Sequence, residues 1–371
     1  MKVLRLVADD LTGAVDAAAP FARVDAPVAV LRDIARAGEC AGAWAWDAAT
    51  REGGADEASG KAQRAGALLR GAAIAFRKID SLLRGHVATE IAATAQGGGF
   101  ASAVIAPAFP TQGRVTRQGR QYARKADGAW NAVGGDLLQP LADLGMAPVL
   151  AAHPRDIAGK GVFLCDADSD ADLAAIAAAG RRLAPPVLWC GSAGLARALA
   201  GATRCCALPT DPLLGVIGSR HPGAVAEVDR LRARRPSIVR LIGSWDGIAD
   251  SVENATQMLN AARSVVLALR LPALPAAEAA SALRHLAREC TALRSSALFA
   301  SGGDTLAALA DAAGAARLDC LGEIMPGVPL SRMAGGCWNG VAVVSKSGGF
   351  AAGDVLMRLF DHEMEKKRAQ A

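Results

Sequence analysis

Aromatic residues are scarce in this chain of 371 residues, at 4% of the total. Proteins that bind single-stranded nucleic acid stack its bases on aromatic side chains, so this scarcity argues against such a partner. The net charge of +5 is mild, and no basic tract is long enough to indicate DNA or RNA binding. We therefore expect no nucleic-acid partner, and the small positive charge favours anionic small molecules instead.

Long apolar runs are also missing, because Gly, Pro or a charged residue interrupts each run well short of a membrane span. Met1 leads straight into a strand-like segment, without the charged and apolar regions of a signal peptide. The eight cysteines form no CxxC pair and have no His partner at metal-ligand spacing. These features predict a cytoplasmic protein with reduced thiols and no membrane partner, and they leave any metal ligands unknown.

The length exceeds the usual size of one hydrophobic core, so two domains are expected. Short apolar runs of strand type alternate with helical segments, which predicts an α/β fold with an open, mainly parallel sheet flanked by helices in each domain. The segment 207–214 contains two prolines between strand-like runs and marks the boundary. The predicted domains are 1–206 and 213–371.

The first stretch with functional chemistry is ADDLTGA (8–14), where a short strand turns into a small-residue helix predicted from Gly13 to Phe21. Ligands of open parallel sheets bind beyond the carboxyl ends of the strands, where Asp9 and Asp10 fall. Acidic residues at a helix start often only cap the helix. We expect one of the two acids to have a capping role and the other a working role, and Thr12 is a candidate cap.

A second polar stretch, KIDSLLRG (78–85), follows a strand predicted over 74–77. A planar Arg suits a carboxylate or phosphate, and Lys adds a point charge. The alternative is a solvated helix start whose charges pair with each other, and the spacing does not decide between the two. The candidate binding residues here are Lys78, Asp80, Ser81 and Arg84.

A third stretch, APAFPTQGR (106–114), follows the next predicted strand and contains two prolines and a glycine. This composition predicts an ordered loop over 107–119. Arg114 is its functional candidate, and the alternative is an exposed Arg on a rigid surface turn.

These three stretches, in this order, resemble the N-terminal signature of the four-carbon acid sugar kinase family, whose members phosphorylate threonate, erythronate or 3-oxo-tetronate with ATP. The segment 121–148 departs from the family pattern and looks trimmed, which bears on the substrate more than on the chemistry. The GSAGLA stretch (191–196) is also similar to the family. Its Ser192 is compatible with anion binding or with a simple helix cap.

Glycine-rich turns between strands and helices mark the second half of the chain. Free amides and the helix dipole favour phosphate at such turns, although each alone is compatible with a tight turn that needs glycine for steric reasons. The stretches SGGDT (301–305), EIMPGVP (323–329) and KSGGF (346–350) resemble the nucleotide-binding half of the same family. Ala351 stands where relatives typically have Gly. The predicted nucleotide-binding residues are Ser219, Gly302, Gly303, Asp304, Thr305, Gly327, Lys346, Gly348 and Gly349.

The resemblance implies an active site in the cleft between the domains, with ATP and Mg²⁺ as cofactors. It places Arg84 and Lys78 on the carboxylate of a sugar acid and Arg114 near the entering phosphate. Asp10 takes or orients the proton of the terminal hydroxyl, so Asp10 and Arg84 are the predicted catalytic residues. The predicted substrate-binding residues are Asp9, Asp10, Lys78, Asp80, Ser81, Arg84 and Arg114.

Three alternatives stay open at this point: a non-catalytic sugar-acid-binding protein, a kinase of a different small hydroxy acid, and an NAD(P)-dependent dehydrogenase. Against the last, no GxGxxG motif with an acid about 20 residues beyond it is present. A P-loop motif, GxxxxGK[ST], is absent as well. A homodimer is left open.

Overall fold

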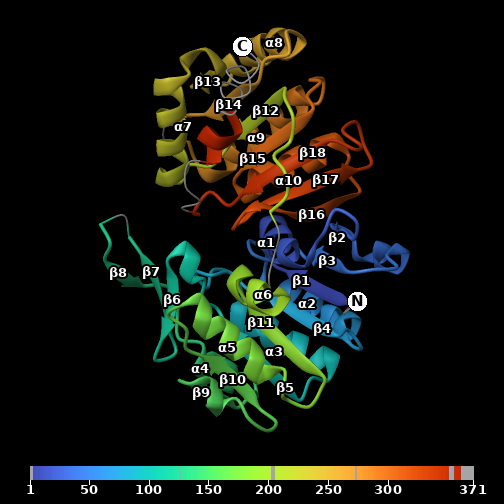
Figure 1. Ribbon diagram of the computed structural model, residues 1–371, viewed down its shortest axis with the longest axis vertical. Coiled ribbons are helices and arrows are strands. Elements are labelled where there is room, and N and C mark those ends of the chain that lie inside the picture. The colour runs from blue at the N-terminus through green and yellow to red at the C-terminus, as the bar shows by residue number, and fades with distance from the viewer. Residues whose placement is uncertain (1–2, 126, 202–204, 272–273, 351–354, 361–371) are drawn as a thin grey trace. The chain divides into compact units, whose positions relative to one another are not determined.

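The computed structural model describes residues 3–125, 127–201, 205–271, 274–350 and 355–360 (Figure 1). The chain divides into two compact units, 1–204 and 205–371. Each unit is built on a mostly parallel sheet with accompanying helices, which confirms the predicted α/β class. In these described ranges no helix is both long and apolar enough to span a membrane.

The first unit contains a parallel sheet in the order β2-β3-β1-β4-β11-β5-β10-β9. Its strands are β1 (Leu4–Ala8), β2 (Val28–Leu31), β3 (Trp44–Asp47), β4 (Ile74–Lys78), β5 (Ser102–Ala106), β9 (Pro148–Ala151), β10 (Val162–Cys165) and β11 (Val187–Gly191). A separate antiparallel sheet consists of β6 (Arg114–Arg117), β7 (Arg120–Arg124) and β8 (Trp130–Ala132). The predicted loop over 107–119 is therefore wrong in part, because its second half forms strand β6 and the turn that leads to β7.

The helices of this unit pack in two groups. One group is α2 (Ala55–Leu69), α3 (Val87–Gly98) and α4 (Leu138–Asp143), and the other is α1 (Leu11–Ala18), α5 (Asp170–Gly180) and α6 (Ala193–Ala200). Short 3₁₀ turns are η1 (Ala19–Phe21), η2 (Ile34–Glu39), η3 (Pro110–Gln112) and η4 (Pro154–Asp156). Small residues allow the close packing, since a Cβ added to Gly66 of α2 would lie 2.2 Å from the Thr94 carbonyl oxygen of α3.

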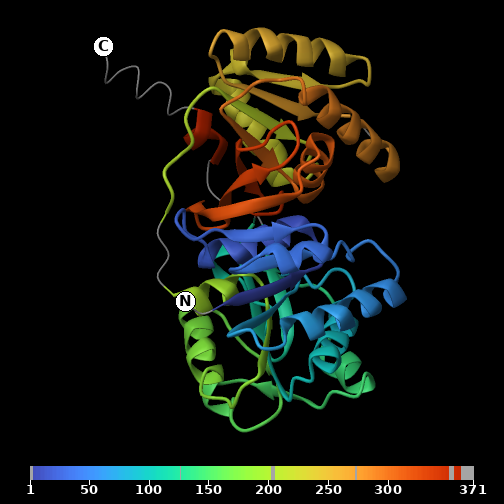
Figure 2. The same ribbon diagram turned by 90° about the vertical axis from the view of Figure 1, so that its right-hand side faces the viewer.

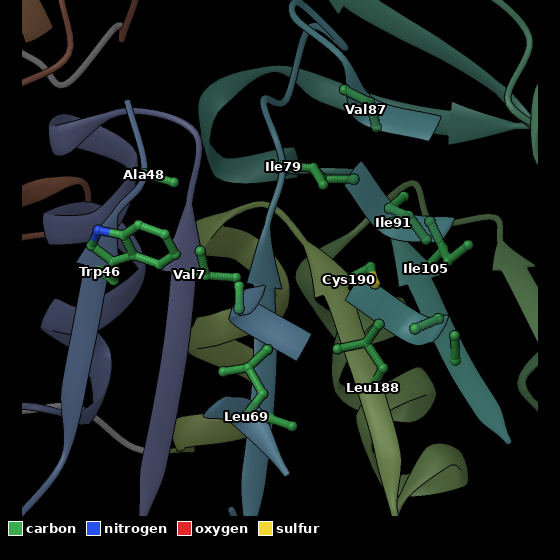
Figure 3. Packing of buried hydrophobic residues seen from close by; sticks show 14 of the residues in the cluster. Val7, Trp46, Ala48, Leu69, Ile79, Val87, Ile91, Ile105, Leu188 and Cys190 are labelled. Atoms are coloured by element: carbon green, nitrogen blue, oxygen red, sulfur yellow. The ribbon is translucent and has the colours of Figure 1, made fainter. Parts of the chain in front are cut away.

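The core of the first unit lies between its sheet and the α2, α3 and α4 group. Val7, Trp46 and Leu188 contribute from the strands, and Leu69 and Ile91 from the helices (Figure 3). Burying a side chain of this size contributes about 1.5–3 kcal/mol to folding. This packing makes the sheet a rigid base for the loops at its carboxyl edge.

The second unit has the strand order β13-β14-β12-β15-β18-β17-β16. Its parallel strands are β12 (Leu213–Ile217), β13 (Val239–Ile242), β14 (Val265–Leu269), β15 (Ala297–Ser301) and β18 (Ala342–Lys346). Its helices are α7 (Pro222–Arg234), α8 (Gly247–Asn260), α9 (Ala276–Cys290) and α10 (Gly303–Ala313), with a 3₁₀ turn η5 (Pro236–Ile238).

An antiparallel hairpin of β16 (Arg317–Met325) and β17 (Val328–Ala334) completes this sheet (Figure 2). No strand was predicted over 317–334. The register of the hairpin shifts between Cys320 and Gly322 and again between Glu323 and Met325, so the simple alternation that reveals a strand is broken. Pro329 of β17 also obscures the strand signal, because proline is unusual inside a sheet.

Candidate functional site

Polar side chains gather at the carboxyl edge of the first unit's sheet, where β3, β1 and β4 are neighbours. Ala8 of β1 pairs with Asp47 of β3, and Val7 pairs with Arg77 of β4. The residues that follow these strands therefore come from adjacent positions on one edge. This arrangement brings Asp9 and Asp10 next to the stretch that begins at Lys78.

Asp10 is the N-cap of α1, and its Oδ1 accepts a hydrogen bond of 2.9 Å from the Gly13 amide. The prediction of Thr12 as the cap is wrong, since Thr12 lies inside the helix. The Asp9 side chain is 2% exposed and that of Asp10 is 24% exposed, so Asp10 is the acid that a ligand can reach. A Cβ on Gly13 would lie 2.4 Å from Asp10 Oδ1 and 3.1 Å from Lys78 Nζ, which explains the glycine.

Arg51 joins both acids and was missed by the sequence analysis. Its Nε and Nη2 donate to Asp9 at 2.7 and 2.9 Å, and its Nη1 and Nη2 donate to Asp10 at 2.6 and 2.9 Å. The same Nη2 lies 3.6 Å from Asp80 Oδ1. Arg51 follows β3 by four residues in the loop before α2. Applying the carboxyl-edge rule to β3 as well would have identified this residue.

Asp80 and Arg84 form a bidentate pair, with Arg84 Nε and Nη2 at 3.0 and 2.8 Å from the carboxylate. Burial alone would raise the pKa of Asp80. The hydrogen bonds from Arg84 and the charges of Arg51 and Lys78 outweigh it and hold that pKa well below its usual value. The charges of this stretch do pair with each other, but they do so beside Asp9 and Asp10. Lys78 is buried, and its Nζ donates to the Ile79 carbonyl oxygen at 2.8 Å.

Ser81 and Arg114 adjoin this group through the β6–β7 hairpin. Gln121 of β7 donates from Nε2 to the Ser81 carbonyl oxygen at 2.9 Å. Arg114, at the start of β6, is buried and donates to the Gln112 carbonyl oxygen. Burial lowers the pKa of Arg114, and the negative charge of Asp80 opposes this shift. Six of the seven predicted substrate-binding residues are linked by charge interactions with at least one other member: Asp9, Asp10, Lys78, Asp80, Arg84 and Arg114.

Of the two roles expected for Ser192, anion binding and helix capping, the structure shows the helix cap. Its Oγ donates to the Ala108 carbonyl oxygen at 2.5 Å and accepts from the Gly194 amide at 3.0 Å. The side chain is fully buried. It caps α6 and ties it to the loop after β5.

Burial raises the pKa of Asp10, with repulsion from Asp9 added and the positive charges of Arg51 and Lys78 opposing. Burial likewise raises the pKa of Asp47 to about 6 from its ordinary 3.8, helped by the nearby Asp10. A carboxylate with a raised pKa is a better proton acceptor near neutral pH. The edge therefore combines basic carboxylates with guanidinium groups that bind anions.

Asp47 makes the unfolding free energy depend on pH in a specific direction. Because the folded pKa is about 6 and the ordinary value 3.8, the folded state binds more protons between these values, and stability falls as pH rises through this window. The fall amounts to at most about 3 kcal/mol. Asp47→Asn is expected to remove this fall. In urea unfolding, the unfolding free energy of the variant should therefore increase relative to that of the wild type between pH 4 and pH 7. Equal pH slopes for Asp47→Asn, the wild type and the control Asp33→Asn would contradict this origin.

In the second unit, three loops meet at the carboxyl ends of the neighbouring strands β12, β15 and β18. A Cβ on Gly348 would lie 2.1 Å from Ser219 Oγ, and one on Gly302 would lie 3.2 Å from Ser219 Cβ. Gly302 has a φ of +107° and its amide donates to the Lys346 carbonyl oxygen at 2.9 Å. Because only glycine fits at these two positions, no side chain covers this surface beside the N-terminus of α10, and a helix N-terminus suits phosphate groups.

The other predicted nucleotide-binding residues surround this surface in different ways. Gly303 and Asp304 lie in the first turn of α10, and Thr305 Oγ1 donates to Ser301 and accepts from the Gly218 amide. Gly349 lies in the turn after β18. Gly327 is two strands away, in the β16–β17 turn, where its amide donates to Glu323 at 3.2 Å.

Lys346 is 1% exposed, and its ammonium contacts both carboxylate oxygens of Glu227 at 2.9 Å and the Phe350 carbonyl oxygen at 3.1 Å. These partners place it beneath the turn. Its contact with a nucleotide stays a prediction. Ala351 lies outside the described residues. Within the part of the chain that the structure describes, no group of three or more His, Cys, Asp or Glu side chains is arranged to hold a metal ion.

Comparison with known families assigns a role to each half. Residues 4–154 and 138–199 match a sugar-binding N-terminal domain, and residues 214–356 match a nucleotide-binding C-terminal domain. A chain that joins these two domains is a phosphotransferase of the sugar kinase class. It belongs to the four-carbon acid sugar kinase family, which confirms the resemblance seen in the sequence motifs.

Two curated relatives illustrate this membership. A D-threonate kinase of Cupriavidus necator is 34% identical over 378 residues, covering 88% of this chain and 89% of the relative. A 3-oxo-tetronate kinase of Methylobacterium radiotolerans is 27% identical and covers 96% of this chain and 98% of the relative.

Two solved structures share the fold. A Salmonella typhimurium protein described as a putative tRNA synthase aligns with a TM-score of 0.76, covering 99% of this chain and 100% of that one at 19% identity. A Haemophilus influenzae protein aligns with a TM-score of 0.67, covering 98% of this chain and 99% of that one at 17% identity. At these identities the likeness shows the fold alone.

Proposed function

We propose that this protein transfers the γ-phosphoryl group of ATP to the terminal hydroxyl of a four-carbon sugar acid, with D-threonate as the first candidate. The observation that carries the proposal is the 34% identity to a D-threonate kinase over 88% of the chain. The edge cluster of the first unit supports it, because guanidinium groups beside carboxylates suit a ligand that has both a carboxylate and hydroxyls.

In this proposal Arg84 and Lys78 bind the carboxylate of the acid, and Arg114 stabilises the negative charge of the entering phosphate. Arg84 retains an exposed side chain (59%) although its fork holds Asp80, so it is accessible to a ligand. Asp80, kept ionised by its cations, accepts hydrogen bonds from substrate hydroxyls, and the buried Asp9 contributes by holding Arg51. Ser81 is the remaining proposed substrate-binding residue.

Asp10 is the proposed proton acceptor. Its carboxylate is the exposed one of the pair, and its raised pKa favours proton uptake from the terminal hydroxyl. ATP supplies the phosphoryl group that the deprotonating hydroxyl attacks. Phosphoryl transfer depends mainly on positioning and charge neutralisation, which Arg51, Arg84 and Arg114 provide around the acceptor.

The nucleotide fits the second unit, where Gly302 and Gly348 leave the surface beside Ser219 and the N-terminus of α10 free of larger side chains, so that phosphates can approach the helix N-terminus. We propose Mg²⁺ as the accompanying ion, held chiefly by the nucleotide's own oxygens as is usual for this ion. An active site formed in a cleft by both domains, and a homodimer, stay predictions from the sequence.

A coupled ADP-release assay with ATP and Mg²⁺ tests the proposal across D- and L-threonate, D- and L-erythronate and their 3-oxo forms. We expect turnover with the highest kcat/KM for D-threonate. Turnover with another acid of the panel would change the substrate assignment and leave the kinase function supported. Silence across the panel with ATP binding intact would indicate a different hydroxy acid. Loss of ATP binding as well would favour a sugar-acid-binding protein without catalysis.

A further inference from the structure

The loop that carries Arg51 is held on one side by hydrogen bonds to the backbone of Asp9. The amides of Thr50 and Arg51 donate to the Asp9 carbonyl oxygen at 3.0 and 3.2 Å. Ala49 has a φ of +49°, a left-handed conformation that is uncommon for a residue with a side chain, and its amide donates to Asp47 Oδ1 at 2.9 Å. The loop therefore adopts a specific and strained shape, which requires further support.

That support comes from the protein interior, where three buried polar side chains contact one another in series. The Thr50 hydroxyl donates to Glu90 of α3, and Glu90 forms an ion pair with Arg77 of β4. Their exposed fractions are 1%, 2% and 0%. None of the three reaches the surface, so none of them touches a ligand.

A buried ion pair is a poor way to gain stability, because removing two charges from water offsets most of their attraction. An apolar trio would fill the same space at less cost. What the polar chain adds is direction, since a hydrogen bond fixes the Thr50 hydroxyl relative to Glu90 as an apolar contact does not.

The helix that carries Glu90 is held in place by hydrophobic packing. Val87 and Ile91 of the same helix are buried in the cluster that also contains Ala48 of the loop (Figure 3). The position of Glu90 is therefore set by the packed core, and the hydrogen bond passes that position to Thr50, next to Arg51.

We infer that Thr50 and Glu90 are positioning residues for Arg51, which they hold in the geometry that grips Asp9 and Asp10. The inference deepens the proposed function, because a displaced Arg51 changes the site that receives the sugar acid. It assigns a role in substrate binding to a buried threonine and a buried glutamate that lie below that site.

Thr50→Val tests the inference, because it removes the hydroxyl and keeps the shape. We expect the KM for the sugar acid to rise about 10- to 100-fold, as small misplacements of positioning groups do, and the KM for ATP to stay within about twofold. Thr50→Ser restores the hydroxyl and should recover most of the wild-type KM. The matched control is Thr94→Val, which removes a buried hydroxyl from α3 that has no hydrogen-bond partner in the described structure. It should leave both KM values unchanged.

An unchanged sugar-acid KM in Thr50→Val, or equal losses in the Val and Ser variants, would overturn the inference while the kinase function stood. A wild type that phosphorylates none of the acids would instead refute the proposed function. The inference then rests on a second readout, the NMR signal of the Arg51 Nε–H group, assigned from its absence in Arg51→Lys.

This N–H donates to Asp9 at 2.7 Å and should exchange slowly with solvent in the wild type and in Thr94→Val. Thr50→Val is expected to raise its exchange rate at least about tenfold, because the loop opens more often. Equal exchange rates in the wild type and Thr50→Val would overturn the positioning role whatever the substrate.

Discussion

Replacing Asp10 by Asn is expected to lower kcat by about 10³-fold, in the range typical for the loss of a general base. Asn has the size of Asp and also serves well as an N-cap, so the hydrogen bond from the Gly13 amide to the side-chain oxygen is retained. What is lost is the ability to accept a proton from the substrate hydroxyl. The ATP-binding half of the chain is unaltered, so the KM for ATP should remain close to that of the wild type.

The measurement is steady-state ADP release, with urea unfolding to confirm that α1 is intact. Asp33→Asn is a matched control, since Asp33 also caps a helical turn with its side chain, accepting from the Ala35 amide at 2.9 Å. It should behave as the wild type. Retention of kcat within about threefold in Asp10→Asn would reduce Asp10 to a helix cap and move the search for the base to another carboxylate of the edge.

Arg51→Lys should have the largest effect on sugar-acid binding, with KM rising about 100-fold. The guanidinium of Arg51 donates to two carboxylates at once, from three nitrogens, and a lysine ammonium cannot reproduce that fork. The acids then move apart, and the hydroxyl-binding and proton-accepting oxygens lose their common geometry. The KM for ATP should change little.

The variant Arg51→Ala adds a pH signature that a local packing defect does not give. Removing Arg51 leaves Asp9 and Asp10 without their main counter-charge, at a cost of about 3–5 kcal/mol in the unfolding free energy at pH 7. The loss should shrink toward pH 4, because burial and the charge of Asp9 raise the pKa of Asp10 and its protonation removes the repulsion between the two carboxylates. Urea unfolding at both pH values measures it. A loss that is the same at both pH values would show that Arg51 serves packing and not charge balance.

Much of the first unit's site was predictable, because one rule places the residues after parallel strands on one edge. Asp9, Asp10 and the stretch from Lys78 to Arg84 were identified in this way, and the structure brings them together. Arg51 was missed because it lies four positions after its strand, between Thr50 and Glu52 in a short loop that matches no motif. Its partners are 41 and 42 residues away in the chain, a separation that a local pattern does not reveal.

Lys346 illustrates the same limit in the second unit. A lysine between a strand and a Gly-Gly turn is typical of phosphate binding, and the structure places Lys346 as the last residue of β18, directly before that turn. The ion pair with Glu227, 119 residues earlier, is a long-range contact that the sequence does not show. The β16–β17 hairpin was missed for a different reason, because its register shifts hide the strand period.

The cap of α1 has a consequence for the timing of the reaction. Asp10 Oδ1 accepts a hydrogen bond from the Gly13 amide, and this bond is stronger when the carboxylate is ionised, so the cap opposes the increase in the Asp10 pKa that burial causes. A helix cap of this kind is worth about 1 kcal/mol, and part of that sum opposes protonation. The start of α1 therefore favours the ionised form of Asp10. After Asp10 has taken the proton of the substrate hydroxyl, the cap favours release of that proton to solvent, which returns Asp10 to its ionised form before the next turnover.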